Sequence, residues 1–141
     1  MAASKERREL VGRLLGERPY CEACRPIHQF SKVRTSPIQS WNGNGRPNQS
    51  VDIHELVNRS QGGSISYLPN LLSVCRFPCH SWITTHPYES ELLGLHLPRG
   101  RNDDESFEEA ARVRNSWAMG IVTTPEWYDP EIASDYLGEV E

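Results

Sequence analysis

Apolar side chains recur at helical spacing in two stretches, one near each end of the chain. In the range 4–15 they fall on one face of a helix, and a partly apolar face also runs along 106–117. The middle of the chain has only short apolar runs. These runs predict a strand over 51–57, a second short apolar segment over 71–74 and a short helix over 79–85. The pattern therefore predicts a mixed α+β fold.

Turn-forming and polar residues divide the rest of the chain. The range 25–50 is polar and contains three prolines, so we expect a loop or an irregular hairpin there. After Gly120, further prolines and acidic residues predict a loosely packed tail. Three parts follow from this reading: an N-terminal helix over 1–17, a central domain over 18–97, and an acidic C-terminal helix and tail over 98–141.

The composition predicts a small hydrophobic core. The chain has 141 residues, of which 37% are hydrophobic, and its mean hydropathy is −0.61. No apolar run is long enough for a transmembrane helix, and the first residues do not resemble a secretory signal. We therefore expect a cytoplasmic protein with no membrane contact, in the host cell cytoplasm if a phage encodes it.

The four cysteines form two close pairs that are separated by fifty residues. Cys21 and Cys24 have a two-residue spacer, and Cys75 and Cys79 have a three-residue spacer. Disulfides are not expected without a secretory signal. Two such pairs suit four thiolates around one tetrahedral structural Zn²⁺, with a redox pair or simple buried thiols as alternatives. A zinc ion would compensate for a lean core and would clamp the residues between the pairs.

The side chains best suited to metal binding and acid–base catalysis lie between the two cysteine pairs or directly beside them: His54, Glu55, Asn70 and His80. A neutral imidazole binds divalent cations, and a base beside such a ligand can activate a water molecule. An asparagine in the connecting loop can bind backbone groups and hold a base in orientation. The other histidines with no such neighbours, His28 and His96, are interpreted as ordinary surface or core residues.

Four segments in this order, YCEAC, DIHELVNRSQGG, LPNLL and CRFPCHSWITTHP, resemble the HNH endonuclease family, particularly its small zinc-stapled phage and bacterial members. The resemblance covers residues 18–90. It implies a ββα-metal fold (His-Me finger, treble-clef-like), in which a hairpin and a helix grip one catalytic divalent ion, such as Mg²⁺ or Mn²⁺. It also implies hydrolysis of DNA phosphodiester bonds, by nicking or by double-strand cutting.

Taken residue by residue, the resemblance makes His80 a ligand of the catalytic ion and Asn70 the central asparagine. Two alignments of the first motif remain open. In the preferred one, which needs no gap, His54 binds the ion and Glu55 is the general base. In the other, His54 is the general base and Asp52 binds the ion.

Two departures from the family pattern favour a second function. Members often carry a histidine four residues after the position of His80; here that residue is Thr84, and the nearby His86 is a possible substitute. The second cysteine pair also has an extra residue, Phe77 or Pro78. The replacement of the usual base by Glu55 and the missing histidine at Thr84 support an alternative: a catalytically degenerate zinc-binding module that interacts with DNA or protein.

The formal net charge of −4 hides a basic first half that suits DNA. Residues 1–60 have ten Lys and Arg against six Asp and Glu, whereas residues 61–141 have five against thirteen. Basic side chains can neutralise phosphates. The candidates nearest the expected site are Lys32, Arg34, Arg46, Arg59 and Arg76, and those on the first helix are Lys5, Arg7, Arg8 and Arg13. DNA is thus the expected partner, and the resemblance adds a phage terminase large subunit, because small phage members are often encoded beside the terminase.

Overall fold

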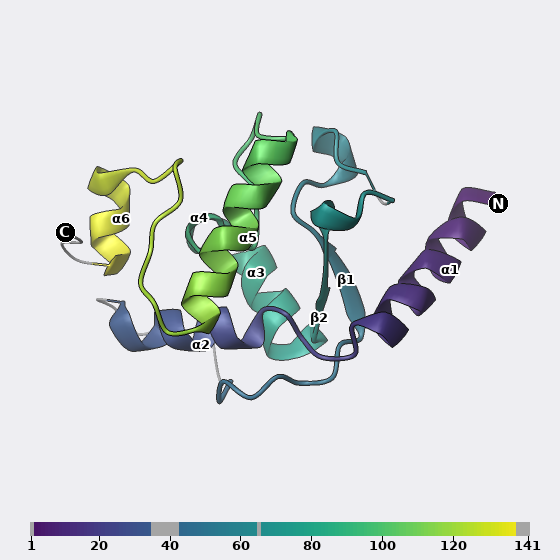
Figure 1. The fold of residues 1–141 in the computed structure, drawn as a ribbon, viewed down its shortest axis with the longest axis horizontal. Helices are drawn as coiled ribbons and strands as arrows, with labels where there is room; N and C mark the ends of the chain where they lie inside the picture. The colour runs from purple at the N-terminus through teal and green to yellow at the C-terminus, as the bar shows by residue number, and fades with distance from the viewer. Residues whose placement is uncertain (1, 35–42, 65, 138–141) are drawn as a thin grey trace.

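The computed structural model describes residues 2–34, 43–64 and 66–137 of the chain. In these ranges the chain forms six helices and one small antiparallel sheet, and the first helix lies on the other side of the sheet from the remaining helices (Figure 1). The helices are α1 (Ala2–Glu17), α2 (Cys24–Val33), α3 (Ser81–Thr85), α4 (Pro87–Leu92), α5 (Asp104–Ala118) and α6 (Pro130–Leu137). The strands are β1 (Asp52–Glu55) and β2 (Leu71–Val74), and three short helical turns are η1 (Arg59–Gln61), η2 (Leu68–Asn70) and η3 (Arg76–His80). The predicted α+β class is confirmed.

Strands β1 and β2 pair in an antiparallel register that sets Asp52 opposite Val74. Strand β2 is buried along its whole length, whereas β1 is only half-buried at its two ends. Successive side chains of a strand point to opposite faces. Asp52 and His54 therefore share one face of the hairpin, and Ile53 and Glu55 share the other.

Helix α1 covers the face of the hairpin that carries Ile53. Leu14 is buried against Ile53 and Leu71. The half-buried residues around this contact are the remaining apolar positions of the predicted helix face: Leu10, Val11 and Leu15. The helix prediction over 4–15 is confirmed, and α1 runs along the sheet to one end of the molecule (Figure 1).

Helix α2 corrects the expectation of a loop over 25–50, of which residues 35–42 lie outside the described ranges. Cys24, Ile27 and Phe30 follow one another at three-residue intervals, so they form one buried stripe. Pro26 lies in the first turn, where a missing N–H costs no intrahelical bond. Residues 43–50 then continue with little regular structure, apart from one antiparallel bridge between Tyr20 and Gln49.

Helix α5 belongs to the main core although the sequence assigned it to a C-terminal appendage. Its apolar face packs on α2, with Trp117 meeting Phe30 edge-on at a ring distance of 5.7 Å. The other α5 residues in this core are Phe107, Ala110 and Val113. Asp103 caps the helix by accepting a hydrogen bond from the Ser106 amide at 2.7 Å. The acidic side chains of 103–109 mostly lie on its exposed side.

The segment after Gly120 is not the loosely packed tail that its composition predicted. It ends in α6, and Trp127, Tyr136 and Leu137 pack against the main core. The Trp127 indole donates to the Glu91 carbonyl at 2.9 Å. Aromatic anchors thus hold an acidic segment whose charges remain in solvent.

The segment that follows β2 turns sharply before its helix begins. One helix over 79–85 was predicted, but the chain forms the turn η3 and then α3. Phe77 interrupts the helical geometry because its backbone is extended, with φ −127° and ψ 132°. Helix α4 follows at Pro87 and was not predicted. In the described part of the chain, none of the helices has the length and apolar character needed to cross a bilayer.

Candidate functional site

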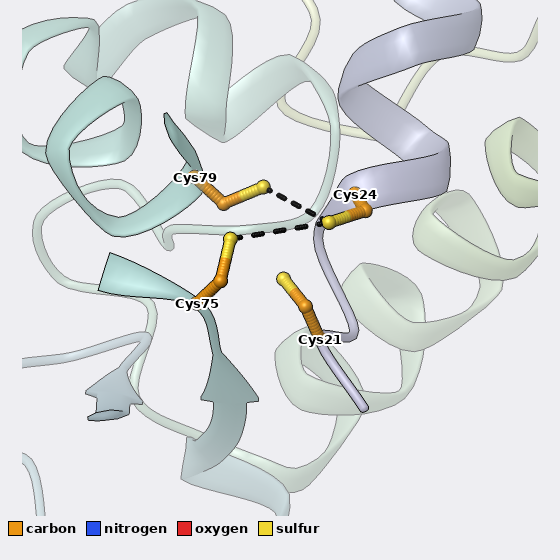
Figure 2. A group of neighbouring side chains, drawn as sticks. All are labelled: Cys21, Cys24, Cys75 and Cys79. Atoms are coloured by element: carbon orange, nitrogen blue, oxygen red, sulfur yellow. Dashed lines mark hydrogen bonds between the residues drawn. The ribbon is translucent and has the colours of Figure 1, made fainter. Parts of the chain in front are cut away.

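The four cysteines gather at one point, where the loop before α2 meets the turn after β2. Their Sγ atoms all lie within 4.8 Å of one another, and all four side chains are buried. Figure 2 shows the sulfurs turned toward a shared centre. The Sγ atom of Cys24 lies 3.5 Å from that of Cys79 and 3.9 Å from that of Cys75. These spacings exclude disulfides, in which the sulfurs are about 2.05 Å apart. The cluster can hold a metal ion.

The donor set of this cluster fits a tetrahedral ion. Four thiolates at the usual Zn–S length of about 2.3 Å would have their sulfurs about 3.8 Å apart, close to the spacings found here. Amide groups face the sulfurs: the Ala23 amide donates to Cys21 at 3.4 Å, and the Asn48 backbone amide donates to Cys24 at 3.5 Å. Such N–H groups stabilise bound thiolates. Hydrogen bonding to Cys21 raises the pKa of Cys79, so this thiol keeps a proton that a bound ion would displace.

The cysteine cluster also positions the residues that follow it in the chain. Cys75 directly follows β2 and Cys79 lies in η3, so binding both to the start of α2 would fix the turn against the hairpin. His80 follows Cys79 directly. The clamp therefore presents His80 to the face of β1 that carries Asp52 and His54.

A pocket of about 380 Å³ opens beside this face. Three of its lining residues were predicted site residues: His54, Glu55 and His80. The others are Arg7, Ile53, Asn58, Ile83, Thr84, Pro87 and His96. The rings of His54 and His80 meet edge-on with centroids 5.5 Å apart. We call this depression the histidine pocket.

Asp52 and His80 contact each other beside the histidine pocket, which His80 lines and Asp52 does not. The Asp52 Oδ2 atom lies 3.0 Å from the His80 Nδ1 atom. The guanidinium of Arg76 binds the same carboxylate, with NH2 to Oδ1 at 3.0 Å, and this hydrogen bond holds the pKa of Asp52 below its usual range. Two ligands in adjacent positions of an octahedral ion, each about 2.1 Å from it, are about 3 Å apart. The hydrogen-bonded Asp52 and His80 atoms have a similar spacing, so an ion that displaced the shared proton could bind both.

His54 is buried and hydrogen-bonded in a way that fixes its proton. Its Nε2 atom lies 2.6 Å from the Leu95 carbonyl oxygen, which can only accept. We therefore assign the proton to Nε2, which leaves a lone pair on Nδ1. Burial lowers the pKa of His54 to about 4, so the ring is neutral at physiological pH.

Glu55 lies on the opposite face of β1 from Asp52 and lines the histidine pocket beside Arg7. Its carboxylate accepts a hydrogen bond from Arg7 of α1 at 2.8 Å, and its side chain is only 12% exposed. The ion pair anchors α1 beside the histidine pocket. Arg7 is thus the cation of the first helix that lines this pocket among the residues described.

Asn70 lies outside the histidine pocket and is fully buried. Its Oδ1 atom accepts from the Val57 amide at 2.8 Å, and its Nδ2 group donates to the carbonyls of Val57 at 3.1 Å and Ser64 at 3.0 Å. The side chain thereby closes the loop that connects β1 to η2. A Cβ on Gly63 would lie 1.7 Å from the Val57 carbonyl oxygen, so only glycine permits this approach.

Comparison with known proteins found no matching family model, no similar curated protein and no similar solved structure. The geometry of the cysteine cluster and of the histidine pocket is therefore the basis for assigning a function.

The candidate DNA-contacting residues have different surroundings. Lys32, Arg46 and Arg76 are exposed, and none of them lines the histidine pocket. Arg34 is bound to Glu89 with both side chains nearly buried, so it is not available to a phosphate. The side chain of Arg59 lies outside the described structure.

Sequence reasoning missed two contributions to the histidine pocket. His96, interpreted as an ordinary histidine, lines the pocket, and its Nδ1 atom lies 3.6 Å from a Glu91 carboxylate oxygen. The Leu95 carbonyl orients His54, and no side-chain motif can reveal a backbone acceptor. Thr84 lines the pocket at the position of the missing family histidine, while His86 stacks on Trp82 outside it.

Proposed function

We propose that this chain is a metal-dependent endonuclease of the HNH type that hydrolyses DNA phosphodiester bonds. The observation that carries the proposal is the 3.0 Å contact between Asp52 and His80 beside the neutral imidazole of His54. A carboxylate in contact with an imidazole ligand, and a neutral base in the pocket that the same imidazole lines, are the groups that metal-assisted hydrolysis needs.

Of the two alignments of the first motif, the second has the stronger geometric support. Asp52 shares a face of β1 with His54 and touches His80, so Asp52 and His80 would hold the catalytic ion. Glu55 is engaged by Arg7 on the other face and is poorly placed to act as the general base. We therefore assign the base role to His54.

The proposed reaction is the attack of a water molecule on the scissile phosphate. The Nδ1 lone pair of His54 accepts the proton of the water, while the Leu95 carbonyl holds the Nε2–H and stabilises the imidazolium that forms. The water oxygen bonds to phosphorus as the bond from phosphorus to the leaving oxygen breaks. A divalent ion such as Mg²⁺ or Mn²⁺ would supply stabilisation of the negative charge that develops on the phosphate and the leaving oxygen.

Arg7 is suited to binding the phosphate at the other wall of the histidine pocket. One of its NH groups is used by Glu55, and a guanidinium retains further donors. Because α1 carries this residue, the first helix would join the catalytic unit. Arg76, which lies beside Asp52 and His80, is a second cation suited to the backbone of the bound strand.

Zinc is the ion that we propose for the four-cysteine cluster. Four thiolates with tetrahedral spacing favour a soft or borderline ion, and a closed shell of four protein ligands is typical of structural zinc. The catalytic ion and the structural ion are then distinct, because their donor sets differ.

A plasmid-nicking assay tests the proposed activity. The full chain should convert supercoiled plasmid to the nicked or linear form when Mg²⁺ or Mn²⁺ is added. His80→Ala, Asp52→Asn and His54→Gln should each lower the rate by at least about 100-fold, because each removes a ligand or the base. Glu55→Gln should retain far more activity than any of these three.

Two controls make the assay decisive. His28→Gln changes a half-buried histidine that does not line the pocket, so it should cleave like the wild type. The zinc content and circular dichroism of each variant should match those of the wild type. Unchanged cleavage by folded His80→Ala would refute the site, and loss in Glu55→Gln with retention in Asp52→Asn would restore the first alignment.

The second candidate is a catalytically degenerate module that binds DNA or protein. It is favoured by the engagement of Asp52, whose two oxygens are occupied by Arg76 and His80. For such a module, wild-type protein would bind the plasmid without cutting it in any divalent ion. Binding would then be unaffected by Asp52→Asn.

A further inference from the structure

Phe77 is a large apolar side chain that the chain holds in solvent next to the proposed active site. The three-residue spacer between Cys75 and Cys79 contains it, and its extended backbone separates it from the helical residues that follow. Its exposed fraction is 72%, whereas both flanking cysteines are buried. Because the cysteine cluster fixes both ends of the spacer, Phe77 stands on an anchored turn.

Phe77 lines a second hollow, of about 300 Å³, that adjoins the histidine pocket. The residues lining this hollow are Asp52, Arg76, Phe77, His80, Ser81 and Thr84. His80 and Thr84 also line the histidine pocket, so the two depressions meet at these residues. A strand whose phosphate lies at Asp52 and His80 would therefore have a neighbouring nucleotide within reach of Phe77.

The hollow combines an aromatic face with a cation. Arg76 lines it, with a side chain that is 65% exposed, and it also binds the Asp52 carboxylate. Aromatic side chains stack on nucleobases, and an adjacent guanidinium attracts the phosphate backbone. In a duplex, neighbouring base pairs cover both faces of each base, so only an unpaired base can offer a face to Phe77.

Resting on the proposed function, we propose that Phe77 stacks on an unpaired base of the nucleotide that flanks the scissile phosphate. The substrate class of this enzyme is then single-stranded or locally melted DNA. Arg76 binds the backbone of the same nucleotide, and the extra residue of the second cysteine pair is the feature that provides this contact.

Binding to two forms of one oligonucleotide tests the stacking contact. Fluorescence anisotropy of the full chain measures the Kd for a labelled single strand and for its duplex, without added Mg²⁺ or Mn²⁺ so that the DNA stays intact. Phe77→Ala should weaken single-strand binding about fivefold or more and change duplex binding by less than about twofold. Phe77→Trp should bind like the wild type. Met119→Ala, a matched control with a 74% exposed side chain at the end of α5, should have no effect.

Each other result overturns the stacking contact. An unchanged single-strand Kd in Phe77→Ala, or an equal loss of affinity in Met119→Ala, shows that Phe77 contributes no more to DNA binding than any other exposed apolar side chain. A loss confined to the duplex, or equal for both forms, shows that Phe77 acts as a wedge between base pairs or as a general contact.

Plasmid nicking separates this failure from failure of the proposed function. If the wild type nicks DNA and Phe77→Ala binds single strands normally, the nuclease stands and the stacking contact is wrong. If neither protein nicks DNA while Phe77→Ala selectively loses single-strand binding, the contact stands and the nuclease function is wrong.

Discussion

His54 differs from the other two histidines of the pocket because its ring is almost completely buried. His54 is 7% exposed, whereas the side chains of His80 and His96 are 29% and 22% exposed. Burial penalises the charged imidazolium, and the Leu95 carbonyl only partly offsets that penalty. The residue that we assign as the base is therefore held neutral and ready to accept a proton.

The same burial predicts a pH dependence of stability. Because the pKa of His54 falls from 6.5 in the unfolded chain to about 4 in the folded chain, the unfolded chain binds the extra proton between these values. Stability should be fully retained above pH 6.5 and should fall as the pH drops toward 4. From this residue alone, the loss between pH 7 and pH 5 is about 2 kcal/mol.

Urea unfolding of the wild type and His54→Gln at the two pH values measures this contribution. The drop in unfolding free energy should be about 2 kcal/mol larger in the wild type. Zinc content is determined at both pH values, because acid also protonates the cysteines in both proteins. An equal drop in the two proteins would show that folding does not lower the pKa of His54.

At the scale of elements, the loop between β1 and β2 depends on one side chain. Asn70 uses both its oxygen and its amide nitrogen to hold the backbone of Val57 and Ser64. Val57 directly follows Leu56, whose carbonyl accepts from the Leu97 amide at 3.1 Å. The asparagine therefore helps to fix the segment that follows His54 and, through Leu56, the segment of Leu97 that lies beside it.

Asn70→Ala should destabilise the fold by about 3 kcal/mol, because it removes three hydrogen bonds and leaves the Val57 amide buried without a partner. Asn58→Ala is the matched control. Asn58 lies in the same loop, but its side chain bonds only exposed groups of Ser60 and Gln61, so its loss should cost about 1 kcal/mol or less. Urea unfolding compares the two variants. Equal costs would mean that the loop does not depend on Asn70.

The elements with clear periodicity were predictable, and those that depend on partners were not. The stripes of α1 and α5 and the short apolar runs of β1 and β2 can be read directly from the chain. Helix α2 was missed because its ten residues include a proline and polar positions, and its stripe is stabilised by α5 some eighty residues away. Local signals carry no information about such a distant partner.

The candidate site was predictable to a similar extent. The cysteine spacing indicated the cluster, and the histidine and asparagine positions indicated the pocket and its supporting loop. The choice between Asp52 and Glu55 required the strand faces, since a one-residue shift sends a side chain to the opposite side. His96 could not be placed from the sequence because α4 and the following turn, which deliver it, were not predicted.

At the scale of the whole molecule, the cysteine cluster joins parts of the chain that also meet in the main core. It connects the start of α2 to the end of β2 and to η3 (Figure 2). The sheet has only two short strands, which are marginal without further support. The main core spans α2, α3 and α5 and includes the four cysteines themselves.

Removal of the metal should therefore unfold the protein rather than loosen one corner of it. Structural zinc sites contribute on the order of 10 kcal/mol in small peptides, which is comparable to the whole stability of an ordinary domain. We expect one zinc per chain by elemental analysis. Neither the chelated protein nor Cys79→Ser should show a cooperative thermal transition, and both should lose cleavage even when Mg²⁺ is restored.

The control variant Ser81→Ala, two residues further along the same segment, should keep both the zinc and the cooperative transition. If the chelated chain instead melts like the wild type, hydrophobic packing alone holds His80 against Asp52, and the cluster has a role other than fixing the fold.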